Sequence, residues 1–203
     1  MTPDTPGTAR PGGRTARNTA AVLQATLDEL GEHGYAALTV ERVAARSGVH
    51  KATVYRRWGG ADGLVAAALE WSASRTWEPE RTGSLYTDLL ALARAVLHGF
   101  TEAPEGAVSA ASVAAAFASP RVAEALRVFM VDRHERAAVV VAEAAARGEV
   151  PEGTDPAQVV RSAIAPVYYR LFVSREPVAP ADLRLAARVT ADAAARGAFV
   201  PGG

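Results

Sequence analysis

The sequence contains no cysteine, which excludes a disulfide framework and any metal site built on thiolates. Lysine is almost missing as well, because Lys51 stands alone against 21 arginines. No uninterrupted apolar run is long enough to span a membrane, and residues 1–13 lack the apolar core of an export signal. We therefore expect a cytoplasmic protein that has no contact with a membrane.

The overall composition is that of a globular protein. The chain has 203 residues, 49% of them hydrophobic, and a formal net charge of +0. This length fits one or two domains with a sizeable core. The charge is unevenly distributed, since residues 1–60 hold eight basic and five acidic side chains and the remainder has an acidic excess. An excess of positive charge in one segment is a weak indication of polyanion binding.

Hydrophobic periodicity predicts an all-α fold of about nine helices, three small and basic ones followed by six larger ones. No segment shows the period of two that a half-buried strand requires. Gly, Pro and N-cap residues predict where the helices begin and end. The expected helices cover residues 14–32, 39–47, 50–58, 62–73, 84–101, 105–118, 119–147, 156–173 and 182–196, behind a flexible tail at 1–13.

Residues 39–58, TVERVAARSGVHKATVYRRW, match a helix-turn-helix position by position. Ala44 is small where two helices must cross closely, and Gly48 tolerates the positive φ of the turn. Val54 and Trp58 supply the apolar side of the second helix, whose other side offers hydrogen-bond donors suited to phosphates and base edges. The alternative is a short amphipathic hairpin with a solvated, charged face.

The first 65 residues resemble the DNA-binding domain of the TetR family of transcriptional regulators. The motifs that carry the resemblance are Gly34-Tyr35, Leu38-Thr39-Val40, Val43-Ala44, Ser47-Gly48-Val49, Thr53-Val54-Tyr55-Arg56-Arg57-Trp58 and Leu64-Val65. Residues 165–171, APVYYRL, also resemble a helix of one large subgroup. The resemblance implies a helix-turn-helix DNA-binding domain over residues 14–60 and a ligand-binding and dimerisation domain over 61–203.

One segment departs from the family pattern. Gly59-Gly60-Ala61-Asp62 stands where the family usually has a Pro-Ser-Lys-like step. In the family this lysine approaches a phosphate, so we expect one fewer phosphate contact per subunit and a shallower salt dependence of DNA binding. The alternative is that the free N–H groups at the start of this helix still hold a phosphate.

Carried over by motif position, the resemblance implies which side chains meet double-stranded DNA. Thr39 and Tyr55 hold phosphates, and Arg42 lies near the backbone or a base. The side chains expected closest to base edges are His50, Lys51, Thr53 and Arg56, with Arg14 near a neighbouring phosphate or the minor groove. Arg57 is expected either at the edge of the small domain's core or on DNA.

For the larger C-terminal part, the resemblance implies a small-molecule pocket among helices four to seven. Candidate ligand-binding residues are Trp71, Phe100, Phe117, Phe129, Met130 and Tyr168, with Trp77 as a further candidate and His98, His134 and Arg170 as possible polar anchors. The alternative is that these aromatic residues are plain core. Charged residues are sparse in these segments, which favours an apolar or aromatic effector.

The resemblance also implies that the last two helices pair with a second copy of the chain. The expected homodimer interface consists of Ile164, Val167, Leu171, Leu183, Ala186, Val189 and Ala193. An ordinary internal bundle is the alternative. Pro166 is expected to kink its helix.

The function that we expect is that of a repressor, which binds a palindromic operator as a homodimer and is released by a small, largely apolar effector. No catalytic residues, cofactor or metal are expected, since the four histidines lack metal-ligand spacing and no glycine pair forms a phosphate-binding loop. Two alternatives stay open. One is a helix-turn-helix adaptor that binds another protein, and the other is a helical enzyme or carrier.

Overall fold

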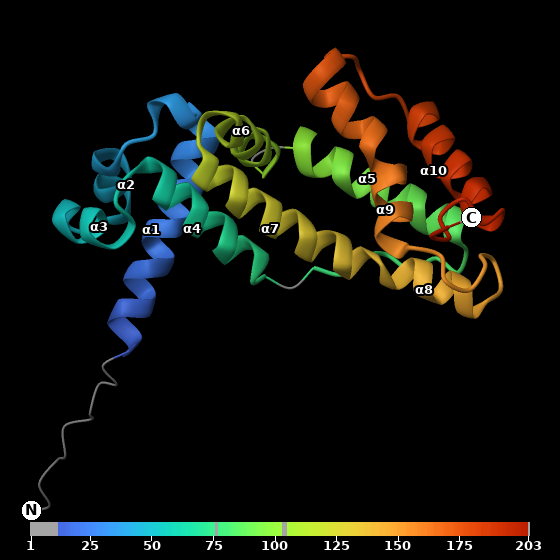
Figure 1. Cartoon of the computed structure of the whole chain (residues 1–203). Helices are drawn as coiled ribbons and strands as arrows, with labels where there is room; N and C mark the ends of the chain where they lie inside the picture. The colour runs from blue at the N-terminus through green and yellow to red at the C-terminus, as the bar shows by residue number, and fades with distance from the viewer. Residues whose placement is uncertain (1–11, 76, 103–104, 203) are drawn as a thin grey trace, which may run out of the picture.

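A computed structural model of the chain describes residues 12–75, 77–102 and 105–202 (Figure 1). These residues form helices and no strand, which confirms the all-α prediction. The α-helices are α1 (Gly12–His33), α2 (Val40–Ser47), α3 (Lys51–Trp58), α4 (Ala61–Ala73), α5 (Leu85–Thr101), α6 (Glu105–Ala118), α7 (Pro120–Ala137), α8 (Val139–Ala146), α9 (Pro156–Tyr168) and α10 (Pro180–Ala195). A 3₁₀ turn (Tyr35–Ala37) follows α1, and a π-helical turn, η2 (Tyr169–Ser174), follows α9.

The helix boundaries differ from the prediction mainly in one place. The long helix expected over residues 119–147 is interrupted at Ala138, which ends α7 and precedes α8. Because Ala138 keeps helical dihedral angles (φ −59°, ψ −20°), apolar periodicity continues through it and conceals the break. Counting α7 and α8 as one gives the nine helices expected of the part that the structure describes. The predicted tail at 1–13 lies outside the described residues except for Gly12 and Gly13, which already belong to α1.

The predicted capping residues act as expected at the helix-turn-helix. The Thr39 side chain accepts a hydrogen bond from the backbone N–H of Arg42 and so caps α2. Gly48 ends α2 in the left-handed conformation (φ 68°, ψ 13°), which a residue with a Cβ adopts only with strain. These two residues set the length of α2 and the direction in which α3 leaves the turn.

Pro166 does not end its helix. It is exposed, α9 continues to Tyr168, and the chain then widens into η2, whose C-cap is Arg175 with a φ of 58°. Proline removes a donor of the α-helical ladder, and π-turns are one way in which a chain accommodates a disturbed ladder. The departure from α-helical geometry therefore lies one turn beyond the position where the sequence predicted a kink.

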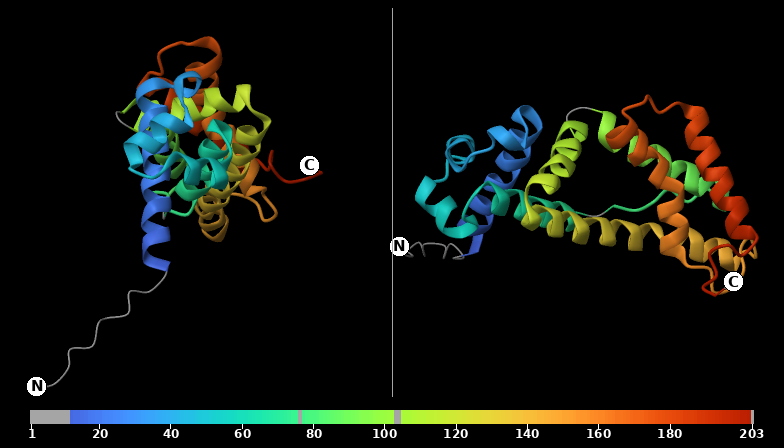
Figure 2. Two further views of the ribbon diagram at one scale, coloured as in Figure 1. Left: turned by 90° about the vertical axis from the view of Figure 1, so that its left-hand side faces the viewer. Right: turned by 45° about the horizontal axis from the view of Figure 1, so that its top comes forward.

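Two hydrophobic clusters form the core. The first contains buried residues of the four helices α1, α2, α3 and α4, together with one buried residue of α6 and two from the first half of α7. The second contains buried residues of α5, α8, α9 and α10, together with one from the end of α7. Helix α7 thus contributes Val122 to the first cluster and Ala137 to the second, and it runs along the molecule between them (Figures 1 and 2). The clusters do not part at the predicted domain boundary, because α4 packs with α1–α3 through Leu64 and Val65.

Candidate DNA-binding face and ligand cavity

Helices α2 and α3 are held on the protein by their apolar sides. Val43, Ala44 and Val54 are buried in the first cluster, and the Trp58 ring fills the space at the end of α3. Because the buried positions of α3 lie four residues apart, the side of this helix that faces solvent is set by the core and not by its charges. The other side of α3 is therefore presented outward at one end of the molecule.

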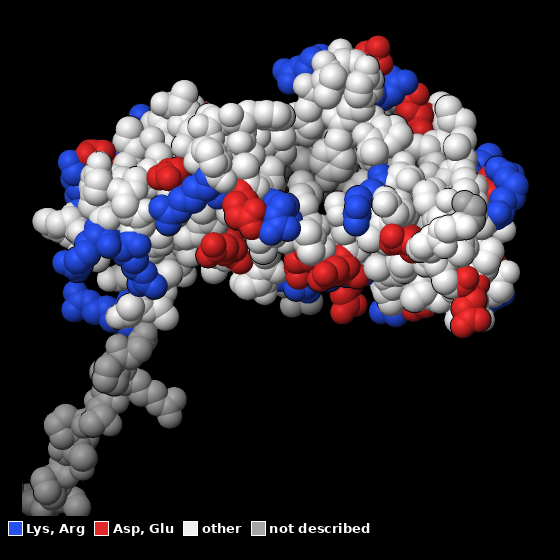
Figure 3. All heavy atoms as spheres, in the orientation of Figure 1, with Lys and Arg blue, Asp and Glu red and all other residues white. Residues whose placement is uncertain are grey.

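A polar groove runs between the exposed side of α3 and the beginning of α1. Thr53 and Arg56 of α3 line it, as do the three α1 residues Thr15, Asn18 and Thr19. Arginine and lysine side chains gather over this end of the molecule (Figure 3). Sequence reasoning did not include the three α1 residues, although their i, i+3, i+4 spacing puts them on one polar helix face.

Two of the predicted DNA-binding side chains are already engaged within the chain. The Lys51 ammonium at the start of α3 forms an ion pair with Glu41 of α2, which lowers the pKa of Glu41 and raises that of Lys51. Arg42 Nε donates to Glu29 Oε2 of α1 at 2.6 Å. Any DNA contact by Lys51 or Arg42 would have to compete with these carboxylates, a competition that residue type and spacing did not reveal.

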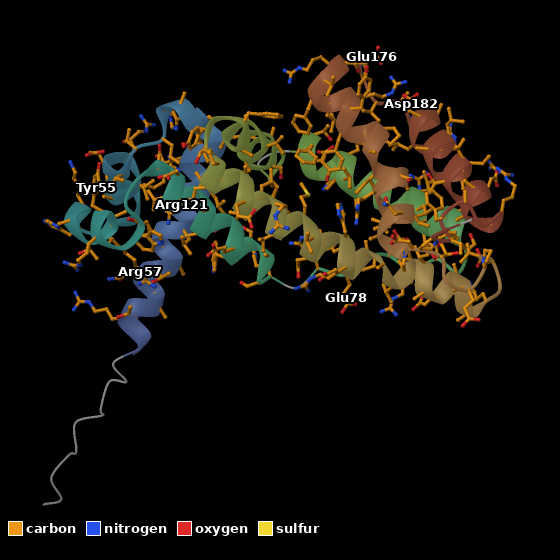
Figure 4. The ribbon with its side chains drawn as sticks, in the orientation of Figure 1. Tyr55, Arg57, Glu78, Arg121, Glu176 and Asp182 are labelled. Atoms are coloured by element: carbon orange, nitrogen blue, oxygen red, sulfur yellow. The ribbon has the colours of Figure 1, made fainter. Side chains whose placement is uncertain are left out.

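The remaining predicted residues are accessible. Arg14, Thr39, His50 and Tyr55 are exposed, and Figure 4 labels Tyr55 at the end of the molecule formed by α2 and α3. The guanidinium of Arg57 lies 5.0 Å from the centroid of the Trp58 ring. At this distance a cation–π interaction holds Arg57 against the edge of the small core, which is one of the two placements expected for it.

A second site is a cavity of about 210 Å³ between α5, α7 and α9, bounded also by Ser109 of α6 and by Trp77. Its walls are predominantly apolar, and none of the residues that line it is acidic. They are Trp77, Leu92, Ala95, Val96, Gly99, Phe100, Ser109, Phe129, Met130, Arg133, His134, Ala137, Val160, Ile164 and Tyr168.

The structure brings together four of the six predicted ligand-binding residues. Phe100, Phe129, Met130 and Tyr168 line the cavity, as do Trp77 and the predicted polar anchor His134. The other two predicted residues, Trp71 and Phe117, do not line this cavity. Trp71 packs against the first cluster, and Phe117 at the end of α6 is 87% exposed. The presence of an aromatic residue in a predicted helix does not indicate which other helix its side chain will face.

The other two polar anchors also lie elsewhere. His98 is exposed on α5 and does not line the cavity. Arg170 donates to Glu176 at 2.9 Å and to Asp182 at 3.1 Å, and the two labelled carboxylates mark its position near the turn before α10 (Figure 4). The charged residue in the cavity wall is instead Arg133, which was not among the residues predicted from the sequence.

The residues predicted to face a partner subunit are divided by the structure. Ile164, Val167, Leu183 and Ala186 are buried inside the chain itself, Leu171 and Ala193 are half-buried, and only Val189 is exposed. Four of the seven predicted residues thus pack within the chain, because an apolar stripe predicts burial but does not say against what, and Val189 keeps the exposure that contact with a partner requires. The large apolar side chains exposed on η2 and α10 are Tyr169, Val173, Leu185 and Val189.

Comparison with known proteins identifies the family. A model described as "Bacterial regulatory proteins, tetR family" matches residues 22–68, and one described as "Tetracyclin repressor-like, C-terminal domain" matches residues 79–190. The chain belongs to the TetR family of transcriptional regulators. It is therefore a DNA-binding regulator and not an enzyme.

Individual relatives of this TetR-family regulator agree. It is 28% identical over 159 residues to the HTH-type transcriptional regulator YdeS of Bacillus subtilis, covering 78% of this chain and 80% of YdeS. It is 31% identical over 147 residues to the HTH-type transcriptional regulator AqdR of Rhodococcus erythropolis, covering 72% and 70%. The crystal structure of the TetR family regulator SCO0332 superposes with a TM-score of 0.66 and 30% identity, over 87% of this chain and 97% of that one.

The TetR-family regulator has an unusual beginning of α4. Gly60 occupies the N-cap position and offers no side-chain cap, and Asp62 stands in the first turn. The negative charge of Asp62 interacts favourably with the positive end of the helix dipole, but it would repel a phosphate. The loss of one phosphate contact stays a prediction. Within the described part of the chain, none of the helices combines the length and the hydropathy needed to cross a bilayer.

Glu29 connects the first two helices of this regulator. Its side chain is buried, yet it pairs with Arg42 and, at 2.7 Å, with Arg46 Nε, while His33 Nδ1 lies 3.3 Å away. Burial raises the pKa of Glu29, but the hydrogen bond and charge of Arg42 and the charges of Arg46 and His33 outweigh it and lower the pKa overall. Because these cations neutralise it, we assign no metal to the cluster of Glu29, Glu32 and His33.

This network predicts a loss of stability in acid. A folded pKa below the unfolded value of about 4.5 means that Glu29 stabilises the fold above that pH, and that this contribution is lost as the pH falls through the folded pKa. We expect Glu29→Gln to lower the free energy of unfolding by about 1–2 kcal/mol at pH 7, with a smaller difference below pH 4.5.

Urea titrations at several pH values measure this difference. Glu32→Gln is the matched control, because Glu32 also pairs with Arg46 but is exposed, so its removal changes stability little. A penalty for Glu29→Gln that stayed constant down to pH 3 would contradict the prediction.

Proposed function

We propose that this TetR-family regulator is a cytoplasmic repressor that binds a palindromic operator as a homodimer and is released by a small effector. Residues 14–60 carry the contact with DNA, and residues 61–203 carry the effector cavity and the dimer face. An occupied cavity favours a geometry in which the two α3 helices no longer fit successive major grooves.

The observation that carries this proposal is the position of α7. Its first half packs on α4 through Val122 and Ala125, in the cluster that also holds α3. Its second half supplies Phe129, Met130 and Arg133 to the cavity wall. A single helix thus contacts both the core beneath the DNA-binding face and the effector cavity. This contact supports a coupling between the two sites, because a ligand that shifts α7 also changes the packing of α4.

The homodimer is supported by an exposed apolar surface, which we define as Tyr169, Val173, Leu185 and Val189. All four are between 57% and 67% exposed, on η2 and α10. Large apolar side chains grouped on neighbouring elements are typical of protein interfaces. A second copy is the occupant that a palindromic operator requires, because two-fold symmetry in DNA matches two-fold symmetry in protein.

Titration with DNA tests the proposed function. We would measure fluorescence anisotropy of the DNA flanking the chain's own coding region against a scrambled duplex, each at two salt concentrations. The proposal predicts a preference of roughly a thousandfold or more for the flanking DNA, with two subunits per duplex. Equal, salt-sensitive binding to both duplexes would contradict operator recognition there, and binding to neither would favour the protein-interaction adaptor.

Substitution of the apolar surface tests the dimer. Leu185→Glu combined with Val189→Glu is expected to convert the dimer to a folded monomer, because both side chains are exposed in the single chain and each charge would be buried by a partner. Sedimentation velocity gives the mass, and circular dichroism gives the helix content. Phe117→Glu serves as the control, since Phe117 is more exposed but lies outside this surface. A double variant that sediments like the wild type would refute the assignment.

A further inference from the structure

Arg133 in the cavity wall has no anionic partner among the residues that the structure describes. Its Nη1 atom is buried and makes no hydrogen bond, and its Nη2 atom makes a long one of 3.4 Å to the Ser72 carbonyl. No carboxylate of the described chain lies within ion-pair distance of it, whereas Arg136, on the same helix, donates to Asp132 at 2.9 Å. A buried guanidinium nitrogen without an acceptor is costly for a protein to keep, so the half-buried Arg133 calls for a partner that the described chain does not supply.

Aromatic rings fix the position of this guanidinium. The Cζ atom of Arg133 lies 4.9 Å from the centroid of the Phe129 ring and 5.4 Å from the centroid of the Trp77 ring. Rings at this distance attract the cation, but they accept none of its N–H hydrogen bonds. Burial lowers the pKa of Arg133, and arginine nevertheless remains protonated at neutral pH. The cavity wall therefore carries a fixed positive charge with unused donors.

Tyr168 adds a second unsatisfied donor. The partner of its hydroxyl is the Met130 sulfur at 3.9 Å, which is a weak acceptor. Burial raises the pKa of Tyr168 to about 12, so the hydroxyl keeps its proton. The Tyr168 ring also meets the Phe100 ring edge-on at 5.5 Å. The cavity thus has apolar walls, aromatic edges and two hydrogen-bond donors without good acceptors. These features suit an apolar molecule that bears one acceptor group.

We propose that the effector is a compact organic monoanion, with an aromatic body and a carboxylate-type group that pairs with Arg133. This inference rests on the proposed function and makes the effector class more specific. The cavity of about 210 Å³ is smaller than typical ligand sites of roughly 300–1,000 Å³, which favours a compact molecule. One cation and no acidic side chain in the walls favour a single negative charge.

Calorimetric titration of two matched probe pairs, in the absence of DNA, tests the proposal. The pairs are 1-naphthylacetate with 1-naphthylacetamide, and 3-phenylpropanoate with 3-phenylpropanamide. Acid and amide have nearly the same shape and differ in charge. For at least one pair, we expect the carboxylate to bind the wild-type protein about tenfold or more tightly than its amide. Equal affinities within both pairs, or no binding of either acid, would overturn the proposal.

Arg133→Met removes the charge while keeping apolar bulk. In this variant we expect acid and amide to bind within about twofold of each other, and the amide to bind as it does to the wild type. Arg136→Met is the matched control on the same helix and should keep the preference for the acid. A preference for the acid that survives in Arg133→Met would assign the anion to another residue and refute the role of Arg133.

Thermal unfolding of the ligand-free variants separates this role from a structural one. Because the substitution removes a half-buried charge whose Nη1 atom lacks an acceptor, Arg133→Met should leave the Tm unchanged or raise it. A Tm lowered by several degrees would mean that Arg133 stabilises the fold, and would overturn the proposal. The DNA titration is independent of these results. If the acid binds through Arg133 but adding it does not dissociate the protein from DNA, the proposed release by an effector is refuted, whereas the anion-binding site at Arg133 is confirmed.

Discussion

Gly63→Ala is expected to destabilise the DNA-binding end of the molecule by about 3 kcal/mol or more. Gly63 is buried in the first turn of α4, and a Cβ built there would lie 1.8 Å from the Trp58 carbonyl oxygen. The clash is with backbone, so no side-chain rotation relieves it, and α4 must move away from the end of α3. Because Trp58 closes the core beneath α3, DNA affinity is expected to fall as well.

Urea unfolding followed by circular dichroism measures this loss. The matched control is Gly99→Ala in α5, where an added Cβ meets no atom within 4 Å. Replacement of an interior helical glycine by alanine at such a place should stabilise the protein by about 0.5–1 kcal/mol. A Gly63→Ala variant as stable as the wild type would contradict the close contact between Gly63 of α4 and the Trp58 carbonyl at the end of α3.

Arg56→Glu is expected to weaken binding to the operator roughly a hundredfold or more. Arg56 is exposed, lines the groove between α1 and α3, and has no carboxylate within ion-pair distance in the described chain. The substitution removes a donor worth about 1–3 kcal/mol at a base edge and places a negative charge against DNA. In a homodimer the loss occurs twice.

The anisotropy titration described above measures this effect. Arg94→Glu is the charge-matched control, because Arg94 is exposed on α5 and outside the groove, yet its substitution changes the net charge by the same amount. Equal losses in the two variants would show that Arg56 acts only through net charge. No loss in either would remove α3 from the DNA interface.

Lys51 is expected to matter less than Arg56, although both lie on α3. In the free chain Lys51 pairs with Glu41, so DNA gains a contact from Lys51 only after displacing that carboxylate. An exposed ion pair of this kind is worth about 0–1 kcal/mol, which partly offsets the new contact. The single lysine of the chain is therefore a weaker anchor than its position in the motif indicates.

The helix-turn-helix could be predicted from sequence because its determinants are local. Thr39 caps α2, Gly48 turns the chain, and Val54 and Trp58 identify the buried side of α3 within a few residues of each other. Each requirement selects a residue type, so several matches in one segment leave little freedom. The same reasoning found the start of α9 but placed its end at residue 173, because the apolar pattern does not distinguish α9 from the π-helical turn η2 that follows it.

Sequence alone was thus sufficient for the all-α class, the family and the exposed side of α3, because helix periodicity, caps and turn residues are properties of neighbouring positions. Which side of α9 and α10 faces the chain's own core, and which aromatic residues share a cavity, depended on packing between helices distant in sequence. Which charged side chains form ion pairs with one another also depended on this packing. Lys51 faces Glu41, Glu29 gathers two arginines, and Arg133 is left without an anion, because the core and not the charge pattern sets the orientation of each helix.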